Sequence, residues 1–245
     1  YSEDGQTLLG QAEQGIVGDS ADAEVPYIKH YLASLNQDLP TKLFLLVHVS
    51  NFNYHGGGIW LSPKLGLWKN VSQEAQADKI FDGIIFGIIF IIAFYHLVVF
   101  SQRREDRASL YFAFFCGSIG LRQWMMARFT QELGYGFSID GYSIRTTLEF
   151  LSMPLIVMGC GLFLETLLPN PYFKRFVQGW CIGLGSLLVL LALVTEPTTF
   201  SAYRPLYQVH IVGILASIVY VAVRAVQGNR LARAVTVAFG IIVLG

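Results

Sequence analysis

The hydrophobic positions of this chain follow one pattern up to about residue 79 and another from Ile80 onward. After Ile80, apolar stretches of roughly twenty residues recur, which is about the length that a helix needs to cross a bilayer. The pattern predicts a membrane all-α bundle of five complete transmembrane helices and part of a sixth. We expect these spans near residues 81–100, 108–126, 148–168, 177–194 and 209–226, with the incomplete span at 234–245.

Residues 1–79 show no such stretches and are predicted to form strands and loops. The run Lys42–Ser50 favours a β-strand, and the triple glycine Gly56–Gly58 indicates a tight turn before a second short run, Ile59–Ser62. Two or three strands do not make a stable sheet in water. We therefore expect residues 1–79 to be part of a β-sandwich whose remainder lies before Tyr1.

The connections between the predicted spans carry lysine and arginine unequally. Because the more basic loops of a membrane protein face the cytoplasm, this bias places residues 1–79 outside the cytoplasm. Eight basic residues lie on the predicted inner side, at Arg103, Arg104, Arg107, Lys174, Arg175, Arg224, Arg230 and Arg233. Three lie on the predicted outer side, at Arg128, Arg145 and Arg204.

Composition supports a membrane protein and excludes a nucleic-acid binder. The formal net charge is zero and 53% of the residues are hydrophobic, so the expected partner is the lipid bilayer. All three cysteines fall inside apolar spans, and their spacing fits no zinc or redox site, so no metal or cofactor is expected. The chain begins without Met or a signal peptide and ends in a short apolar run, and we interpret it as a piece of a longer protein.

Several short motifs occur in a characteristic order along the predicted bundle. They include Gly83–Gly87, Phe94–Leu97, Arg103–Asp106, Leu110–Phe112 and Leu121-Arg122. In this order they resemble the membrane domain of the bacterial seven-transmembrane receptors with diverse intracellular signalling modules. Further matches are Leu148–Leu151, Phe163-Leu164, Leu168-Pro169 and Tyr207-Gln208. The outer stretch Leu45–Gly66 is similar to the end of the jelly-roll, galactose-binding-like domain that precedes such bundles.

The resemblance implies a multi-pass receptor of the bacterial inner membrane, with its N-terminal domain outside the cytoplasm. In that family the seventh helix leads into a kinase, a nucleotide cyclase, a diguanylate cyclase or a phosphatase. The 245 residues of the chain contain no recognisable catalytic motif, so we predict no catalytic residue and no enzyme activity for them. The full-length protein could still be an enzyme through its output module.

Polar and aromatic side chains gather around the triple glycine of the outer segment. Asn and His offer directional hydrogen bonds and an aromatic face can stack on a sugar ring, so a small-molecule or carbohydrate-like ligand is conceivable. The commoner alternative is that the glycines form a turn and the aromatic rings fill the sandwich core. The candidate residues are Asn51, Asn53, Tyr54, His55 and Trp60.

Four ionisable residues in or near the spans are candidates for signal relay. Arg122 lies about 22 Å from the inner end of its span, where a charge is costly unless it finds a partner or snorkels. Glu149 is the natural partner for an ion pair. His96 could relay protons or hydrogen-bond a neighbouring helix. Asp82 is expected at the outer end of the first helix, where a negative charge suits the N-terminus.

The leading hypothesis is a transmembrane signalling receptor, and the alternative is a transporter or channel. A transporter is expected to show inverted repeats and helices interrupted near the midplane, and no internal repeat is visible. The pairs Gly83/Gly87 and Gly179/Gly183 have the spacing that lets helices approach closely. They fit packing inside one bundle or the seam of a homodimer, which is the expected assembly.

Overall fold

The computed structural model describes residues 15–25, 34, 44–52, 63–127 and 139–244. The chain divides into two compact units. The first contains residues 1–83 and 127–145, and the second contains residues 84–126 and 146–245.

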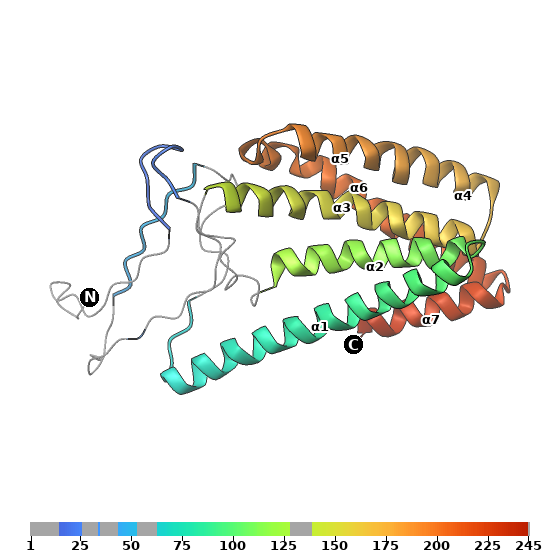
Figure 1. The fold of residues 1–245 in the computed structure, drawn as a ribbon, viewed down its shortest axis with the longest axis horizontal. Coiled ribbons are helices and arrows are strands. Elements are labelled where there is room, and N and C mark those ends of the chain that lie inside the picture. Colours follow the sequence, from blue (N-terminus) through green and yellow to red (C-terminus); the bar gives the residue numbers. More distant parts are fainter. Residues whose placement is uncertain (1–14, 26–33, 35–43, 53–62, 128–138, 245) are drawn as a thin grey trace. The chain divides into compact units, whose positions relative to one another are not determined.

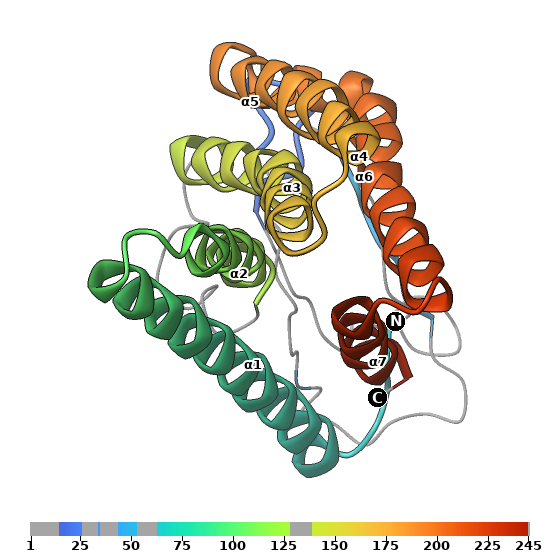
Figure 2. The ribbon, with the colours of Figure 1, turned by 90° about the vertical axis from the view of Figure 1, so that its right-hand side faces the viewer.

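The described part of the chain from Trp68 onward is almost entirely helical (Figures 1 and 2). Helix α4, the π-helical segment η2 and helix α5 follow one another without a break. The elements are α1 (Trp68–Gln102), α2 (Arg107–Met126), α3 (Ile139–Leu167), α4 (Pro171–Phe176), η2 (Val177–Leu184), α5 (Gly185–Val194), α6 (Pro197–Val226) and α7 (Arg230–Leu244).

Four helical stretches of the described residues are long and apolar enough to cross a membrane. These are Trp68–Gln102, Ser143–Leu167, Pro171–Val194 and Ala202–Val226. A helical, membrane-type bundle is therefore confirmed. Helix α2 also forms where a span is predicted, but Arg107 and Arg122 make it more polar than those four. The count of five complete spans and part of a sixth stays a prediction.

Helix α1 is much longer than the span predicted from hydropathy. It begins at Trp68 and runs for 35 residues, or about 52 Å at 1.5 Å per residue, whereas the hydrocarbon of a bilayer is about 30 Å thick. Asp82 therefore lies in the interior of this helix. The electrostatic effect of a helix end falls off within its first turn. Asp82 lies too far along α1 to interact with the helix N-terminus, so that prediction is wrong.

A short antiparallel pair joins Ile16 to Val25 in the described residues before α1. Ile16 and Val25 exchange two hydrogen bonds of 3.1 and 3.0 Å between N–H and C=O, as in an antiparallel pair. The buried carboxylate of Glu24 accepts bonds from the Ser50 hydroxyl and the Phe52 amide, each 2.9 Å long.

The predicted strand Lys42–Ser50 does not form over residues 44–50, the part that the structure describes. An extended run becomes a strand only when a second strand pairs with it, and the described residues supply no such partner. The β-sandwich, with its jelly-roll character, stays a prediction.

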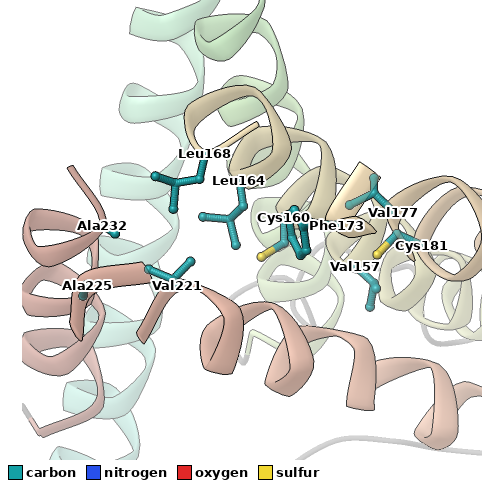
Figure 3. Packing of buried hydrophobic residues seen from close by; sticks show 10 residues of the cluster. All are labelled: Val157, Cys160, Leu164, Leu168, Phe173, Val177, Cys181, Val221, Ala225 and Ala232. Atoms are coloured by element: carbon teal, nitrogen blue, oxygen red, sulfur yellow. The ribbon is translucent and has the colours of Figure 1, made fainter. Parts of the chain in front are cut away.

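The core of the second unit is built around α3. A cluster of buried apolar side chains joins α3 to α4, η2, α6 and α7 (Figure 3). Its members are Val157, Cys160, Leu164, Leu168, Phe173, Val177, Cys181, Val221, Ala225 and Ala232. Interhelical packing of this kind, and not the hydrophobic effect, holds helices together inside a membrane.

Glycines on α3, α5 and α6 let the neighbouring helices approach closely. A Cβ added at Gly159 would lie 2.8 Å from the Cα of Phe115 in α2, so no side chain fits there. Similar approaches of 2.8 Å occur at Gly161, Gly185 and Gly213. By contrast, Gly87 and Gly179 have no atom within 4 Å of such a Cβ. The spacing of Gly83/Gly87 and Gly179/Gly183 therefore does not identify the close contacts, which lie at Gly159, Gly161, Gly185 and Gly213.

Candidate functional site

Three aromatic side chains fasten α6 to its neighbours through backbone carbonyls. The Tyr207 hydroxyl donates to the Leu188 carbonyl of α5 at 3.0 Å, and the Tyr220 hydroxyl donates to the Leu168 carbonyl at the end of α3 at 2.8 Å. The indole N–H of Trp180 in η2 donates to the His210 carbonyl of α6 at 3.3 Å. In lipid a polar group without a partner is expensive, so each bond resists separation of these helices. The three bonds make α3, η2, α5 and α6 one connected core.

The π-helical segment η2 touches both α3 and α6. Cys181 is fully buried at the point where Gly161 of α3 approaches, and Trp180 lies against Gly213 of α6. A π-helix is rare, is usually a single turn and occurs frequently at functional sites. The hydropathy of this stretch predicts a helix but carries no signal for the π-turn.

His210 is a buried residue of α6 beside α5, and sequence reasoning missed it. Its side chain is fully buried in α6, next to the position where Gly185 of α5 approaches. The imidazole faces the backbone of Pro154, but neither nitrogen reaches hydrogen-bond geometry with a described residue. A histidine inside an apolar span is itself a signal, because ionisable residues there are rare and face the interior of the bundle.

His96 packs among aromatic rings. Its ring lies edge-on to Phe112 of α2, with 4.7 Å between the centroids, and next to Tyr95 at 5.2 Å. Phe112 in turn contacts Phe163 of α3, also at 4.7 Å. The buried Nδ1 atom of His96 has no hydrogen-bond partner among the described residues. The expected bond to a neighbouring helix is therefore not seen at Nδ1, and an aromatic contact joins α1 to α2 instead.

Arg122 and Glu149 do not form the predicted ion pair in the described part of the chain. Both side chains are half-buried, and the Nη1 atom of Arg122 is buried without a hydrogen-bond partner among the described residues. The arginine lines a cavity of about 200 Å³ together with residues of α3 and α6. The Ser152 hydroxyl donates a hydrogen bond to the backbone carbonyl of Glu149 and not to its carboxylate.

The predicted ligand site of the outer segment cannot be assembled from the described residues. Asn51 is exposed, next to the Phe52 amide that Glu24 binds. The other four candidates, Asn53, Tyr54, His55 and Trp60, lie outside the described residues.

The remaining candidate for signal relay, Asp82, is half-buried on α1.

Three turns with basic residues inside them or in the adjoining helices, the basic turns, lie at one end of the helical unit, between α1 and α2, α3 and α4, and α6 and α7 (Figure 1). In each turn a side chain binds the first amides of the next helix, the usual role of an N-terminal cap. Asp106 accepts bonds from the Ser109 amide at 3.2 Å and from its hydroxyl at 2.6 Å. Asn170 accepts from Tyr172 and Phe173, and Asn229 accepts from Ala232.

The turn between α6 and α7 is further fixed by its backbone. Gly228 has a φ of 94°, and its amide and that of Asn229 bond back to the Ala225 and Arg224 carbonyls. This is the arrangement that commonly ends a helix at a left-handed glycine. The Arg233 Nε atom also donates to the Ala225 carbonyl, at 3.1 Å. The basic side chains of this turn are therefore held by a well-defined backbone.

The hydrogen bond from the Ser109 hydroxyl holds the pKa of Asp106 below its ordinary value, assisted by the Ser109 amide. The charged carboxylate is the form that both donors stabilise. Asp106 therefore stays negative beside the arginines of the turn between α1 and α2.

The described residues contain no group of three or more His, Cys, Asp or Glu side chains that could hold a metal ion.

No curated protein and no solved structure matches the chain significantly. The family described as 7TM diverse intracellular signalling matches residues 78–245, which covers more than half of the chain. The chain therefore belongs to the family of seven-transmembrane receptors with diverse intracellular signalling modules.

Proposed function

We propose that this chain senses a ligand or partner outside the cytoplasm and relays the state through its helices to a cytoplasmic output module. The family match over residues 78–245 is the observation that carries the proposal. Residues 1–79 form the sensing part, and the output module lies outside the 245 residues. In this proposal the residues of the chain carry no enzyme activity and hold no cofactor.

Helix α1 is the element that connects the sensing part to the bundle. It continues without interruption from Trp68 to Gln102, so a displacement at its outer end reaches the turn that carries Arg103 and Arg104. Only 6% of the residues in its most apolar stretch are buried, against 44% in α3. Segments with few buried contacts move at lower cost than the packed core. We infer that α1 moves against a core of α3, η2, α5 and α6.

We further propose a small-molecule or carbohydrate-like ligand that binds near Asn51 and the residues that follow it, because Asn, His and aromatic side chains gather in this part of the sequence. The receptor works as a homodimer in the bacterial inner membrane. The open surface at Gly87 and Gly179 supports this assembly, since a helix of a second copy can approach there without a clash.

The three basic turns face the cytoplasm in this proposal, because basic residues are retained on that side. A cysteine introduced at Ser101 should resist a membrane-impermeant thiol reagent in intact cells, and one at Asp140 should react. The background is low, because Cys116, Cys160 and Cys181 are buried. The reverse labelling pattern would contradict the proposed topology.

Receptor and transporter can be separated in proteoliposomes. A panel of labelled monosaccharides is added on the side of residues 1–79, and spin labels at Ser101 and Lys174 report on the other end of the helices. The receptor proposal predicts that a sugar changes the distance between the labels without accumulating in the lumen. Accumulation of that sugar in the lumen would favour the transporter.

A further inference from the structure

We propose that the cavity beside Arg122 binds the carboxylate of a single-chain amphiphile, a molecule of fatty-acid chemistry, within the helical unit. This site is separate from the ligand site proposed for residues 1–79. It requires neither the output module nor a signal from outside, so it can be tested on its own.

Arg122 supplies a half-buried positive charge beside this cavity. It lies 15 positions after Arg107, the first residue of α2, which places it about 22 Å along the helix and so about 8 Å from the far side of a hydrocarbon layer about 30 Å thick. Its Nη1 atom is buried without a hydrogen-bond partner, and no ion pair involves this residue in the part of the chain that the structure describes. A charge at this depth is costly unless the side chain snorkels to the interface or an acceptor binds it, and the buried Nη1 atom still needs an acceptor. The geometry therefore favours an acceptor from another molecule.

The cavity next to this charge is apolar. Its volume is about 200 Å³, and its other lining side chains are Met153 and Ile156 from α3 and Ile211 and Ile214 from α6. Arg122 is thus the only ionisable group among the residues that line it. The site combines one cation with a hydrocarbon wall contributed by two further helices.

Water and inorganic oxyanions fit this combination poorly. A buried water needs two to four polar partners, and several waters in a cavity of this size would find one polar side chain among them. An inorganic oxyanion such as phosphate would satisfy the guanidinium but would leave its remaining oxygens against methyl groups and a thioether. A carboxylate with an alkyl chain satisfies both parts, because its two oxygens match the guanidinium fork and its chain covers the apolar wall.

The proposal is tested with the protein in nanodiscs of zwitterionic lipid and a photoactivatable fatty acid that carries a diazirine on its chain. We expect saturable labelling on the peptides that contain Met153–Ile156 and Ile211–Ile214. Unlabelled decanoate should compete at least tenfold better than decanol, since a hydrogen bond to a charged group stabilises binding by an amount equivalent to roughly tenfold or more. Arg122→Gln should lower the affinity for the probe by at least the same factor, and Arg122→Lys should retain part of it.

Arg103→Gln is the matched control, because it removes an exposed arginine from a turn and should leave labelling unchanged. Equal competition by decanol and decanoate would overturn the proposal, as would undiminished labelling of Arg122→Gln. Competition by phosphatidylglycerol as strong as that by decanoate would also overturn it, since it would assign the site to a two-chain phospholipid. If Arg122→Gln does not fold, the comparison of decanoate with decanol on the unmodified protein decides alone.

Discussion

Helices α1 and α3 are both long and apolar, yet they are packed very differently. Ala93 is the one buried residue of α1, whereas α3 places Phe150, Val157, Cys160 and Leu164 in the interior. The side chains of Ile91, Phe94 and Tyr95 on α1 are about two-thirds exposed. The comparison teaches that hydropathy identifies a membrane helix but does not say whether the helix belongs to the fixed core.

The sizes of the interfacial residues explain the difference. Helix α3 presents Gly159 and Gly161 to its neighbours, so backbones come close. Helix α1 presents large rings, and a groove of about 400 Å³ remains between it and α2. The groove is lined by Phe86, Phe90, Phe94, Leu97, Trp124 and smaller residues that include Ala93, Cys116 and Gly120. The large rings of α1 touch α2 at Phe86–Trp124 and His96–Phe112, but they leave Ala93 as the one buried residue of the helix.

The largest expected effect is a truncation in the core. Phe150→Ala should lower the free energy of unfolding by about 3 kcal/mol, because Phe150 is 2% exposed and its ring packs edge-on against Tyr207. Phe94→Ala on α1 is the control and should change stability by less than about 0.5 kcal/mol, since this ring is 60% exposed. Thermal or denaturant unfolding in detergent measures both. Equal losses would show that α1 is packed as tightly as α3.

A smaller loss is expected from adding one methyl group at a helix contact. Gly159→Ala should destabilise the protein by about 1–3 kcal/mol, because the new Cβ meets the backbone of Phe115, which cannot move aside. Gly117→Ala in α2 is the control, with no atom within 4 Å of its Cβ, and should be neutral or slightly stabilising. Melting temperatures of the two variants in the same detergent provide the comparison. A neutral Gly159→Ala would mean that α2 and α3 are not in close contact.

Removing one interhelical hydrogen bond should have a smaller effect again. Tyr207→Phe deletes the donor to the Leu188 carbonyl and should lower stability by about 1 kcal/mol or somewhat less, as is usual in membranes. Tyr172→Phe should have no measurable effect, because Tyr172 is 79% exposed. Each of the two variants differs from the parent by one hydroxyl group. If they melted at the same temperature, the bond of Tyr207 would contribute nothing to the core.

The smallest expected effect is a dependence on pH at the basic end of the unit. Because the pKa of Asp106 is lowered in the folded state, its contribution to stability is present above the ordinary value near 3.8. It is lost as the pH falls through the lowered value, when the carboxylate becomes protonated. Asp106→Asn removes this acid-sensitive contribution, so its melting temperature should change less than that of the parent between about pH 5 and pH 2. Parallel curves for the two proteins would contradict the assignment.

The sequence could predict the helices of the bundle because each needs a long apolar stretch, and that requirement is visible in composition. It could not predict where α1 begins, because Trp68–Lys79 is polar and a helix outside the hydrocarbon needs no apolar run. The wrong prediction that Asp82 lies at the N-terminus of the first helix follows from placing the start of that helix too late. The run Lys42–Ser50 has the composition of a strand, but pairing depends on residues far away in the sequence.

The interior of the bundle was harder to predict than its helices. Trp180, Tyr207 and Tyr220 form the interhelical bonds, yet nothing in their spacing distinguishes them from aromatic residues that face lipid. Arg122 and His96 could be singled out because ionisable residues in a span are rare. The residues that contact Arg122 and His96 could not be predicted, because these contacts depend on how the helices are rotated about their axes.

The central claim is that α1 moves against a fixed core, and electron paramagnetic resonance distances test it most directly. One spin-label pair joins Ser101 at the end of α1 to Lys174 in α4, and the other joins Lys174 to Arg230 at the start of α7, with Ser101 and Lys174 at exposed positions. In nanodiscs we predict a broad distance distribution for the first pair and a narrow one for the second. Two equally narrow distributions would show that α1 is part of the rigid core and would contradict the account.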